Sequence, residues 1–170
     1  MSVDGADFQI QEPWPYKKAT SSKWYSEKFG GAGLRYEVGV SILGGEIVWV
    51  NGPFLPGKYN DHTIFKDHGL LDHLEEGERV EADDGYIFLD PEFTKARSSV
   101  FHPEENRGLR NTVRARHETI NQRMKVFNCL AQKFCHSDLG KHQDCVRAVA
   151  AIVQYALERG EQIWDVQYKG

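Results

Sequence analysis

Residues 34–53 read L-R-Y-E-V-G-V-S-I-L-G-G-E-I-V-W-V-N-G-P and carry the strongest strand pattern in the chain. In the first half, every second residue is apolar and β-prone, which is the period of a half-buried strand. Those residues are Tyr36, Val38, Val40 and Ile42. Gly44-Gly45 then leads into a second β-rich run, and a Gly-Gly pair between two such runs is typical of a β-hairpin. The stretch therefore predicts two antiparallel strands, with Pro53 and Pro56 ending the second.

Strands and helices are also predicted on both sides of this hairpin. We expect a strand over 3–10 before it, a helix that starts at Asn60-Asp61 and ends at Gly77, and a short strand over 79–83. Two further helices follow, over about 109–134 and from Ser137 or Asp138 to about 159. Residues 11–33 and 87–107 are expected to be irregular. This order predicts an α/β fold with an antiparallel start.

The composition indicates one soluble globular domain. The chain has 170 residues, of which 40% are hydrophobic and 27% charged. The first residues carry neither a basic segment nor an apolar core, so a signal peptide is not expected. Apolar runs long enough to span a membrane are missing from the sequence, which excludes a membrane partner. With three cysteines and no secretory signal, we expect reduced thiols and an intracellular protein.

The charge is strongly segregated along the chain. Residues 61–90 hold ten acidic residues against two lysines or arginines, whereas residues 107–133 hold seven basic residues and a single acid, Glu118. Such segregation predicts an anionic partner on one face and cations on another. The alternative is two solvated surfaces that partly neutralise each other.

Three carboxylates stand out by position. Asp4 lies in the first predicted strand, Asp83 at the end of the strand over 79–83, and Glu118 on the polar face of the long helix. Taken singly, each has an ordinary explanation: a turn for either aspartate, an ion pair with Arg114 for Glu118. Converging together, they would repel one another unless divalent cations were bound. Two Mg²⁺ ions held in this way can cleave a phosphodiester.

Several ordered blocks of the sequence resemble DDE superfamily endonucleases, and the Harbinger-like transposases most closely. The blocks are S-V-D-G-A-D-F-Q-I (2–10), W-Y-S-E-K-F (24–29), L-R-Y-E-V-G-V (34–40), I-V-W-V-N-G-P (47–53), N-D-H-T-I-F (60–65), G-E-R-V-E-A-D-D-G-Y (77–86) and R-A-R-H-E-T-I-N-Q-R-M-K-V-F (114–127). They cover nearly the whole chain. The resemblance implies one RNase H-like nuclease domain over 1–170, with a mixed sheet flanked by helices.

The resemblance also implies a chemistry and its residues. Members of this family cut and join DNA with a divalent-metal triad of acids, which here would be Asp4, Asp83 and Glu118 as catalytic residues and metal ligands. We expect Mg²⁺ or Mn²⁺, two ions, and a nuclear protein. The D-x-G-Y block selects Asp83 rather than Asp84, and strand alternation makes the same choice. Asp61 matches a recurrent family position, and we interpret it as a helix cap rather than a metal ligand.

Double-stranded DNA is the expected partner. Phosphates attract lysine and arginine, and the predicted contacts to the DNA backbone are Arg114, Arg116, Arg123 and Lys125. The helix-turn-helix region of full-length relatives is absent from residues 1–170, so we expect a homo-oligomer or a separate DNA-binding protein to assist. Two alternatives stay open: an inactive or domesticated nucleic-acid-binding module, and a protein-interaction domain that uses the acidic segment 61–90.

Overall fold

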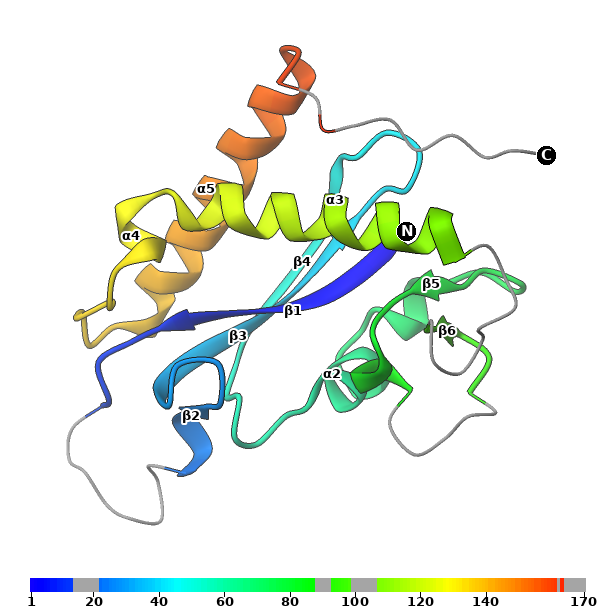
Figure 1. Ribbon diagram of the computed structural model, residues 1–170. Helices are drawn as coiled ribbons and strands as arrows, with labels where there is room; N and C mark the ends of the chain where they lie inside the picture. Colours follow the sequence, from blue (N-terminus) through cyan, green and yellow to red (C-terminus); the bar gives the residue numbers. More distant parts are fainter. Residues whose placement is uncertain (14–21, 88–92, 99–106, 162, 164–170) are drawn as a thin grey trace.

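A computed structural model describes residues 1–13, 22–87, 93–98, 107–161 and 163 (Figure 1). The strands are β1 (Ser2–Gln9), β2 (Tyr25–Ser26), β3 (Gly31–Val40), β4 (Ile47–Phe54), β5 (Val80–Glu81) and β6 (Ala96–Arg97). The α-helices are α2 (Asp61–Asp67), α3 (Arg107–Lys125), α4 (Asn128–Ala131) and α5 (Leu139–Glu158). The described residues also form two 3₁₀ turns, η1 (Leu71–His73) and η2 (Asp84–Tyr86).

The six strands form one mixed sheet in the order β2-β3-β1-β5-β6, with β4 also paired to β3. β1 is antiparallel to β3, and β3 is antiparallel to β4. β5 and β6 continue the sheet on the other side of β1 in parallel orientation. The predicted α/β class, the mixed sheet and its antiparallel start are therefore confirmed.

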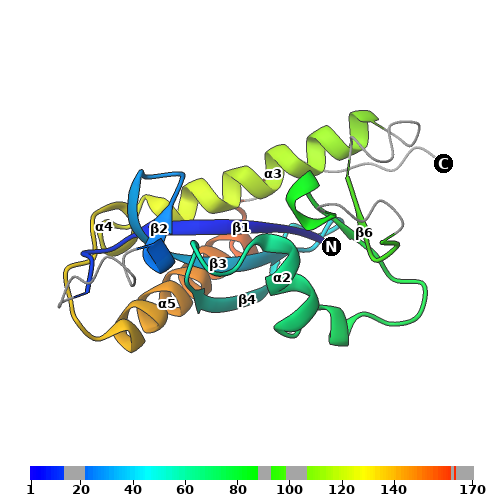
Figure 2. The same ribbon diagram turned by 90° about the horizontal axis from the view of Figure 1, so that it is seen from below.

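Helices cover the two faces of the sheet, each over its own hydrophobic core. α3 lies beside β1 (Figure 2), and together with α5 it covers the face that presents Phe8, Tyr36 and Val38. α2 packs on the opposite face, where Phe65 meets Val3, Val80 and Tyr86. α4 and α5 lie toward one end of β1, and α2, β5 and β6 lie toward the other (Figure 1).

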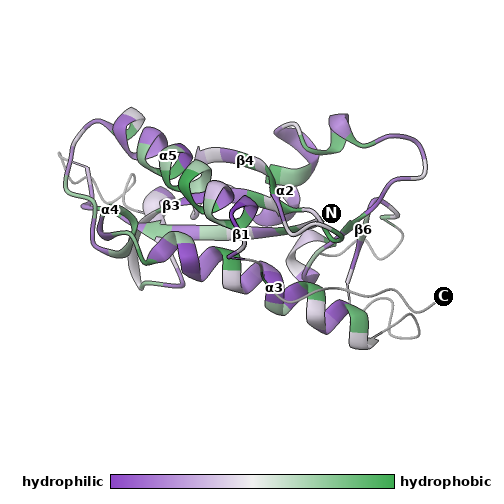
Figure 3. Cartoon of the chain, turned by 90° about the horizontal axis from the view of Figure 1, so that it is seen from above, coloured by the Kyte–Doolittle hydropathy of each residue, from purple (hydrophilic) through white to green (hydrophobic). Residues whose placement is uncertain are grey.

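The two covering helices on the first face differ in character. α3 is mostly hydrophilic, whereas α5 carries longer hydrophobic stretches (Figure 3). α5 buries one apolar stripe, made by Val146, Val149, Ala150, Val153 and Leu157. α3 buries Ile120 and Met124 but also the polar His117 and Asn121. Polar side chains of α3 therefore face the sheet, which positions them for the site described below.

Most predicted elements are present, and the differences have local causes. The predicted helix over 109–134 is two helices, because Phe127 is extended and the chain then turns to pair Phe134 with Ile10 near the end of β1. The helix from Asn60 stops at Asp67, and Gly69 follows with a positive φ of 117°. Such a conformation favours glycine and cannot continue a right-handed helix.

Two short strands were missed in segments expected to be irregular. β2 pairs with the start of β3, and β6 pairs with β5. β6 has no alternating pattern, and it forms because Val80 and Ala82 donate their backbone N–H groups to Lys95 O and Arg97 O. The remainder of the predicted irregular segments 11–33 and 87–107 falls partly outside the described residues.

The N-cap of α2 supplies a stability prediction. Asn60 Oδ1 accepts a hydrogen bond from Thr63 N at 2.8 Å, so the cap is Asn60 and not the following aspartate. We expect Asn60→Ala to lower the free energy of unfolding by ~1 kcal/mol, the usual cost of a lost cap. Urea unfolding measures this loss. Asn111→Ala, at an exposed position within α3, is the matched control, and an equal loss there would contradict the assignment.

Candidate active site

Asp4 on β1 and Asp83, two residues beyond the end of β5, occupy equivalent positions relative to the pairing of these two parallel strands. Ser2 of β1 is paired with Glu81 of β5, and each aspartate follows its paired residue by two positions. Residues two apart along a strand point to the same face of the sheet. That face is the one covered by α3, since Arg110 of α3 pairs with Glu81 at 3.3 Å. The strand register therefore brings the two carboxylates together beneath α3.

The local backbone of Asp83 explains where its strand ends. Asp83 caps η2, and its Oδ1 accepts a hydrogen bond from Gly85 N at 2.9 Å. The chain turns away from β1 at this point, so β1 and β5 separate just beyond the paired residues. Asp84 is exposed at the start of η2 and lies outside the set of described residues that line the cleft.

α3 contributes polar side chains to the same cleft from above the sheet. Asn121 Nδ2 donates to Asp4 Oδ2 at 3.0 Å, and His117 Nδ1 and Ser2 Oγ share a hydrogen bond of 2.8 Å. Glu118 follows His117 directly and is exposed on α3. Because these contacts fix α3 over β1, they also fix where Glu118 stands relative to Asp4.

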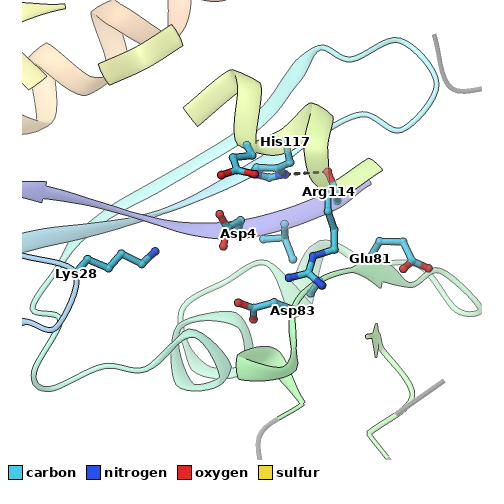
Figure 4. Close-up of a pocket in the computed structure, with 10 residues that line it drawn as sticks. Asp4, Lys28, Glu81, Asp83, Arg114 and His117 are labelled. Carbon is cyan, nitrogen blue, oxygen red and sulfur yellow. Dashed lines mark hydrogen bonds between the residues drawn. The ribbon is translucent and has the colours of Figure 1, made fainter. Parts of the chain in front are cut away.

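The three predicted acids line one cleft of about 310 Å³, together with Ser2, Lys28, Glu81, Arg114 and His117. Figure 4 shows Asp4 on β1, Asp83 after β5, Arg114 on α3 and Lys28 from the turn after β2 around this opening. Lys28 Nζ donates to Gly5 O at 2.6 Å, next to Asp4. The geometry thus gathers Asp4, Asp83 and Glu118, which lie far apart in the sequence.

Burial and neighbouring charges set the electrostatics of Asp4. Burial raises the pKa of Asp4, and the charge of Asp83 raises it further, while Lys28 opposes both effects. The influence of Asp83 means that the two carboxylates are near enough to repel each other. A cation between them would relieve both the repulsion and the cost of burying charge.

Asp61 is not the N-cap of α2, although the sequence predicted that role for it. Asn60 makes the cap, and Asp61 Oδ1 instead pairs with Arg35 at 3.2 Å. Burial raises the pKa of Asp61 to about 6, Arg35 opposes that rise, and the charges of Asp83 and Asp4 add to it. The prediction of a cap was wrong because asparagine and aspartate are nearly equal as caps, and the sequence cannot choose between neighbours.

The four predicted DNA-contacting residues have different environments. Arg114 is exposed and lines the cleft, and Lys125 is half-buried with its Nζ 5.7 Å from the centre of the Phe8 ring. Arg123 donates to Glu161 O at 2.6 Å. Arg116 is only 3% exposed, and its guanidinium donates to Ile42 O at 2.7 Å in the β3–β4 turn. Because the Arg116 guanidinium is bound to this turn and buried, we do not propose Arg116 as a DNA contact.

Sequence reasoning missed His117 and Lys28, which line the cleft, and Asn121, which donates a hydrogen bond to Asp4. His117 and Asn121 were hidden because polar residues on a charged helix are usually solvated, and Lys28 because it lies in a turn. The available signal was the spacing of His117, Asn121 and Lys125, which are four residues apart and therefore share one helix face. That face meets β1.

The cleft offers oxygen donors of the kind that Mg²⁺ and Mn²⁺ prefer. Within the described residues, no three histidine, cysteine, aspartate or glutamate side chains are close enough together to hold a metal ion as they stand. The donor chemistry and the repulsion between Asp4 and Asp83 nevertheless suit a divalent cation. No helix in the described part of the chain has the length and apolar character needed to cross a membrane.

Comparison with known families gives a match over most of the chain. The family model described as DDE superfamily endonuclease matches residues 3–154. The matched segment contains the described strands and helices from β1 to most of α5, and with them every acid discussed above. Comparison with curated proteins and with solved structures returned no match.

Glu37 supplies a test of the buried charge beneath this site. It is 1% exposed, and Trp49 Nε1 donates to its Oε2 at 2.9 Å. Burial raises the pKa of Glu37 to about 7, against the bond from Trp49. A pKa raised by folding means that stability is greatest below the unfolded pKa of Glu37 and is lost as pH rises through about 7.

We therefore expect Glu37→Gln to flatten the fall in stability between pH 5 and 8. One unit of pKa shift corresponds to about 1.4 kcal/mol, so the difference between variant and wild type should change by a few kcal/mol over this range. Urea unfolding at several pH values measures it. Glu46→Gln, an exposed acid near the β3–β4 turn, is the control, and parallel curves for wild type and Glu37→Gln would contradict the prediction.

Proposed function

The chain belongs to the DDE superfamily endonuclease family, and from that premise we propose that it is a divalent-metal-dependent DNA endonuclease or transposase catalytic domain. The observation that carries the proposal is the cleft in which Asp4, Asp83 and Glu118 come together from a strand, a strand end and a helix. Families of this type generally use divalent metal ions and act on DNA, which supports both the cofactor and the substrate class.

Asp4, Asp83 and Glu118 would hold the metal. Mg²⁺ or Mn²⁺, as two ions, would activate a water or hydroxyl nucleophile and stabilise the leaving oxygen of the phosphodiester. Asn121 orients Asp4 through the bond to its Oδ2, and the backbone of Gly85 orients Asp83. Ser2 and His117 keep α3 against β1, so that Glu118 stays at the mouth of the cleft.

Lys28 and Arg114 give the cleft cationic sides. Both line it, and both are exposed. Their charges suit the phosphates on either side of a scissile bond. We therefore propose Arg114, Arg123, Lys125 and Lys28 as backbone contacts. The contacts hold DNA in place without reading its bases.

Cleavage of supercoiled plasmid DNA in Mg²⁺ or Mn²⁺ tests the proposed activity. We expect nicking by the wild-type chain, and a loss of at least ~100-fold in Asp4→Asn, Asp83→Asn and Glu118→Gln, since even outer residues of metal sites can cost that much. Asp84→Asn, adjacent in sequence but exposed outside the cleft, is the control and should keep its activity.

The outcomes of the plasmid assay distinguish an active nuclease from an inactive nucleic-acid-binding module. Undiminished activity in the Asp83 and Glu118 variants would exclude the proposed triad. Binding of DNA by the wild type without cleavage in either metal would favour the inactive nucleic-acid-binding module.

The proposed contacts are tested by the salt dependence of duplex binding, measured without divalent cations. Each lost phosphate contact should reduce the slope of log affinity against log salt by about 1. We expect that reduction for Arg114→Gln and for Lys28→Gln. Arg147→Gln, an exposed arginine on α5, is the control and should leave the slope unchanged. Equal slopes for all four proteins would contradict the proposed DNA path.

A further inference from the structure

A fourth carboxylate reaches the site from the other face of the sheet. Asp4 points toward α3, whereas its neighbour Gly5 is paired with Glu37 and lies on the face covered by α2. A Cβ on Gly5 would collide with Oδ1 of Asp61, the first residue of α2. The missing side chain of Gly5 therefore leaves room for the Asp61 carboxylate directly against β1, one residue from Asp4.

Asp61 also lies across Gly85 from Asp83. A Cβ on Gly85 would be 3.0 Å from Asp83 Oδ1 and 3.4 Å from Asp61 Oδ2, so a space the size of a methyl group separates the two carboxylates. α2 and η2 pack against each other and fix this arrangement. Two glycines thus allow one carboxylate to approach both Asp4 and Asp83.

The Arg35 guanidinium beside Asp61 also pairs with a second carboxylate, that of Asp7. Arg35 donates from Nε to Asp7 Oδ1 at 2.7 Å and from a terminal nitrogen to Asp7 Oδ2 at 3.1 Å. Asp7 is fully buried, and Ser26 Oγ also donates to it at 2.6 Å. Because Arg35 faces two carboxylates, it holds Asp61 in place without neutralising both, and the group keeps an excess of negative charge.

Buried polar atoms near Asp61 have unmet hydrogen-bonding capacity. Asp61 Oδ1 and the hydroxyl of Tyr86 are both buried without a hydrogen-bond partner among the described residues. Tyr86 is fully buried, and the charges of Glu37 and Asp61 add to the rise that burial causes in its pKa. Asp61 Oδ1, the oxygen that faces Arg35, therefore has an ion pair but no hydrogen bond, so the Asp61 carboxylate is incompletely satisfied by its protein neighbours.

We infer that Asp61 is a fourth carboxylate of the cation site, held by the Asp7–Arg35 pair and contributing charge to an oxygen-preferring divalent cation bound near Asp4 and Asp83. This inference rests on the proposed function. A simple partner of Arg35 would stabilise the metal-free protein. A carboxylate placed among other carboxylates instead destabilises the metal-free protein and strengthens cation binding, because the cation removes the repulsion.

The two roles make opposite predictions for Asp61→Asn. We expect the melting temperature without metal to stay the same or rise, and the Mg²⁺ concentration for half of the maximal melting-temperature shift to increase about 10-fold. Asp61→Glu, which keeps the charge, should recover part of the Mg²⁺ affinity. Asp67→Asn, an exposed acid on the same helix, is the matched control and should behave as wild type.

The results separate this inference from the proposed function. An unchanged Mg²⁺ dependence in Asp61→Asn, with the shift lost in Asp83→Asn, overturns the role of Asp61 and leaves the proposed function standing. A lower metal-free melting temperature with unchanged Mg²⁺ dependence assigns Asp61 to the Arg35 pair alone and also overturns it. Absence of any Mg²⁺ shift in the wild type overturns the cation site itself and the inference with it.

Discussion

β1 is paired along its whole length with β3, whereas on its other side it meets β5 at Ser2, within the described residues. This unequal pairing is the constraint on which the site depends. The antiparallel partner buries β1 in the sheet and fixes its orientation, so Asp4 is held at a central strand even though it stands near the first residue. The parallel partner pairs at one point and then diverges, which opens the cleft at Asp4 and Asp83.

α3 completes the site through polar contacts that add to the burial of its Ile120 and Met124. A helix packed by apolar residues alone can slide along a sheet with little change in buried area. The hydrogen bonds between His117 and Ser2 and between Asn121 and Asp4 prevent this sliding. Each forms only when α3 places its side chain within hydrogen-bond distance of that partner on β1. A buried hydrogen bond that loses its partner costs about 1–3 kcal/mol, so a shifted α3 would be penalised at both contacts. The same polar contacts that set the register also orient Asp4.

Three partly or fully buried carboxylates lie on the two faces of the sheet, and burial is the main reason that their pKa values are raised. Glu37, Asp61 and Asp4 all have pKa values raised mainly by burial. Such groups weaken the metal-free fold at neutral pH, and proteins keep them where a ligand repays the cost. Asp4 lines the cleft and Asp61 lies against the neighbouring Gly5, which agrees with membership of a nuclease family whose members generally use divalent cations.

The sequence by itself determined the strands β1, β3 and β4, the last helix with its start at Ser137 or Asp138, and the three acids that line the cleft. Local periodicity, turn chemistry and ordered family blocks carry that information, because each depends on residues close together in the chain. Only the tertiary structure decided that Asp61 faces Arg35, that Arg116 of α3 is buried against the β3–β4 turn, and that Asn121 holds Asp4. These contacts join residues between 26 and 117 positions apart. Strand register and helix docking set them, and neither leaves a pattern in the local sequence.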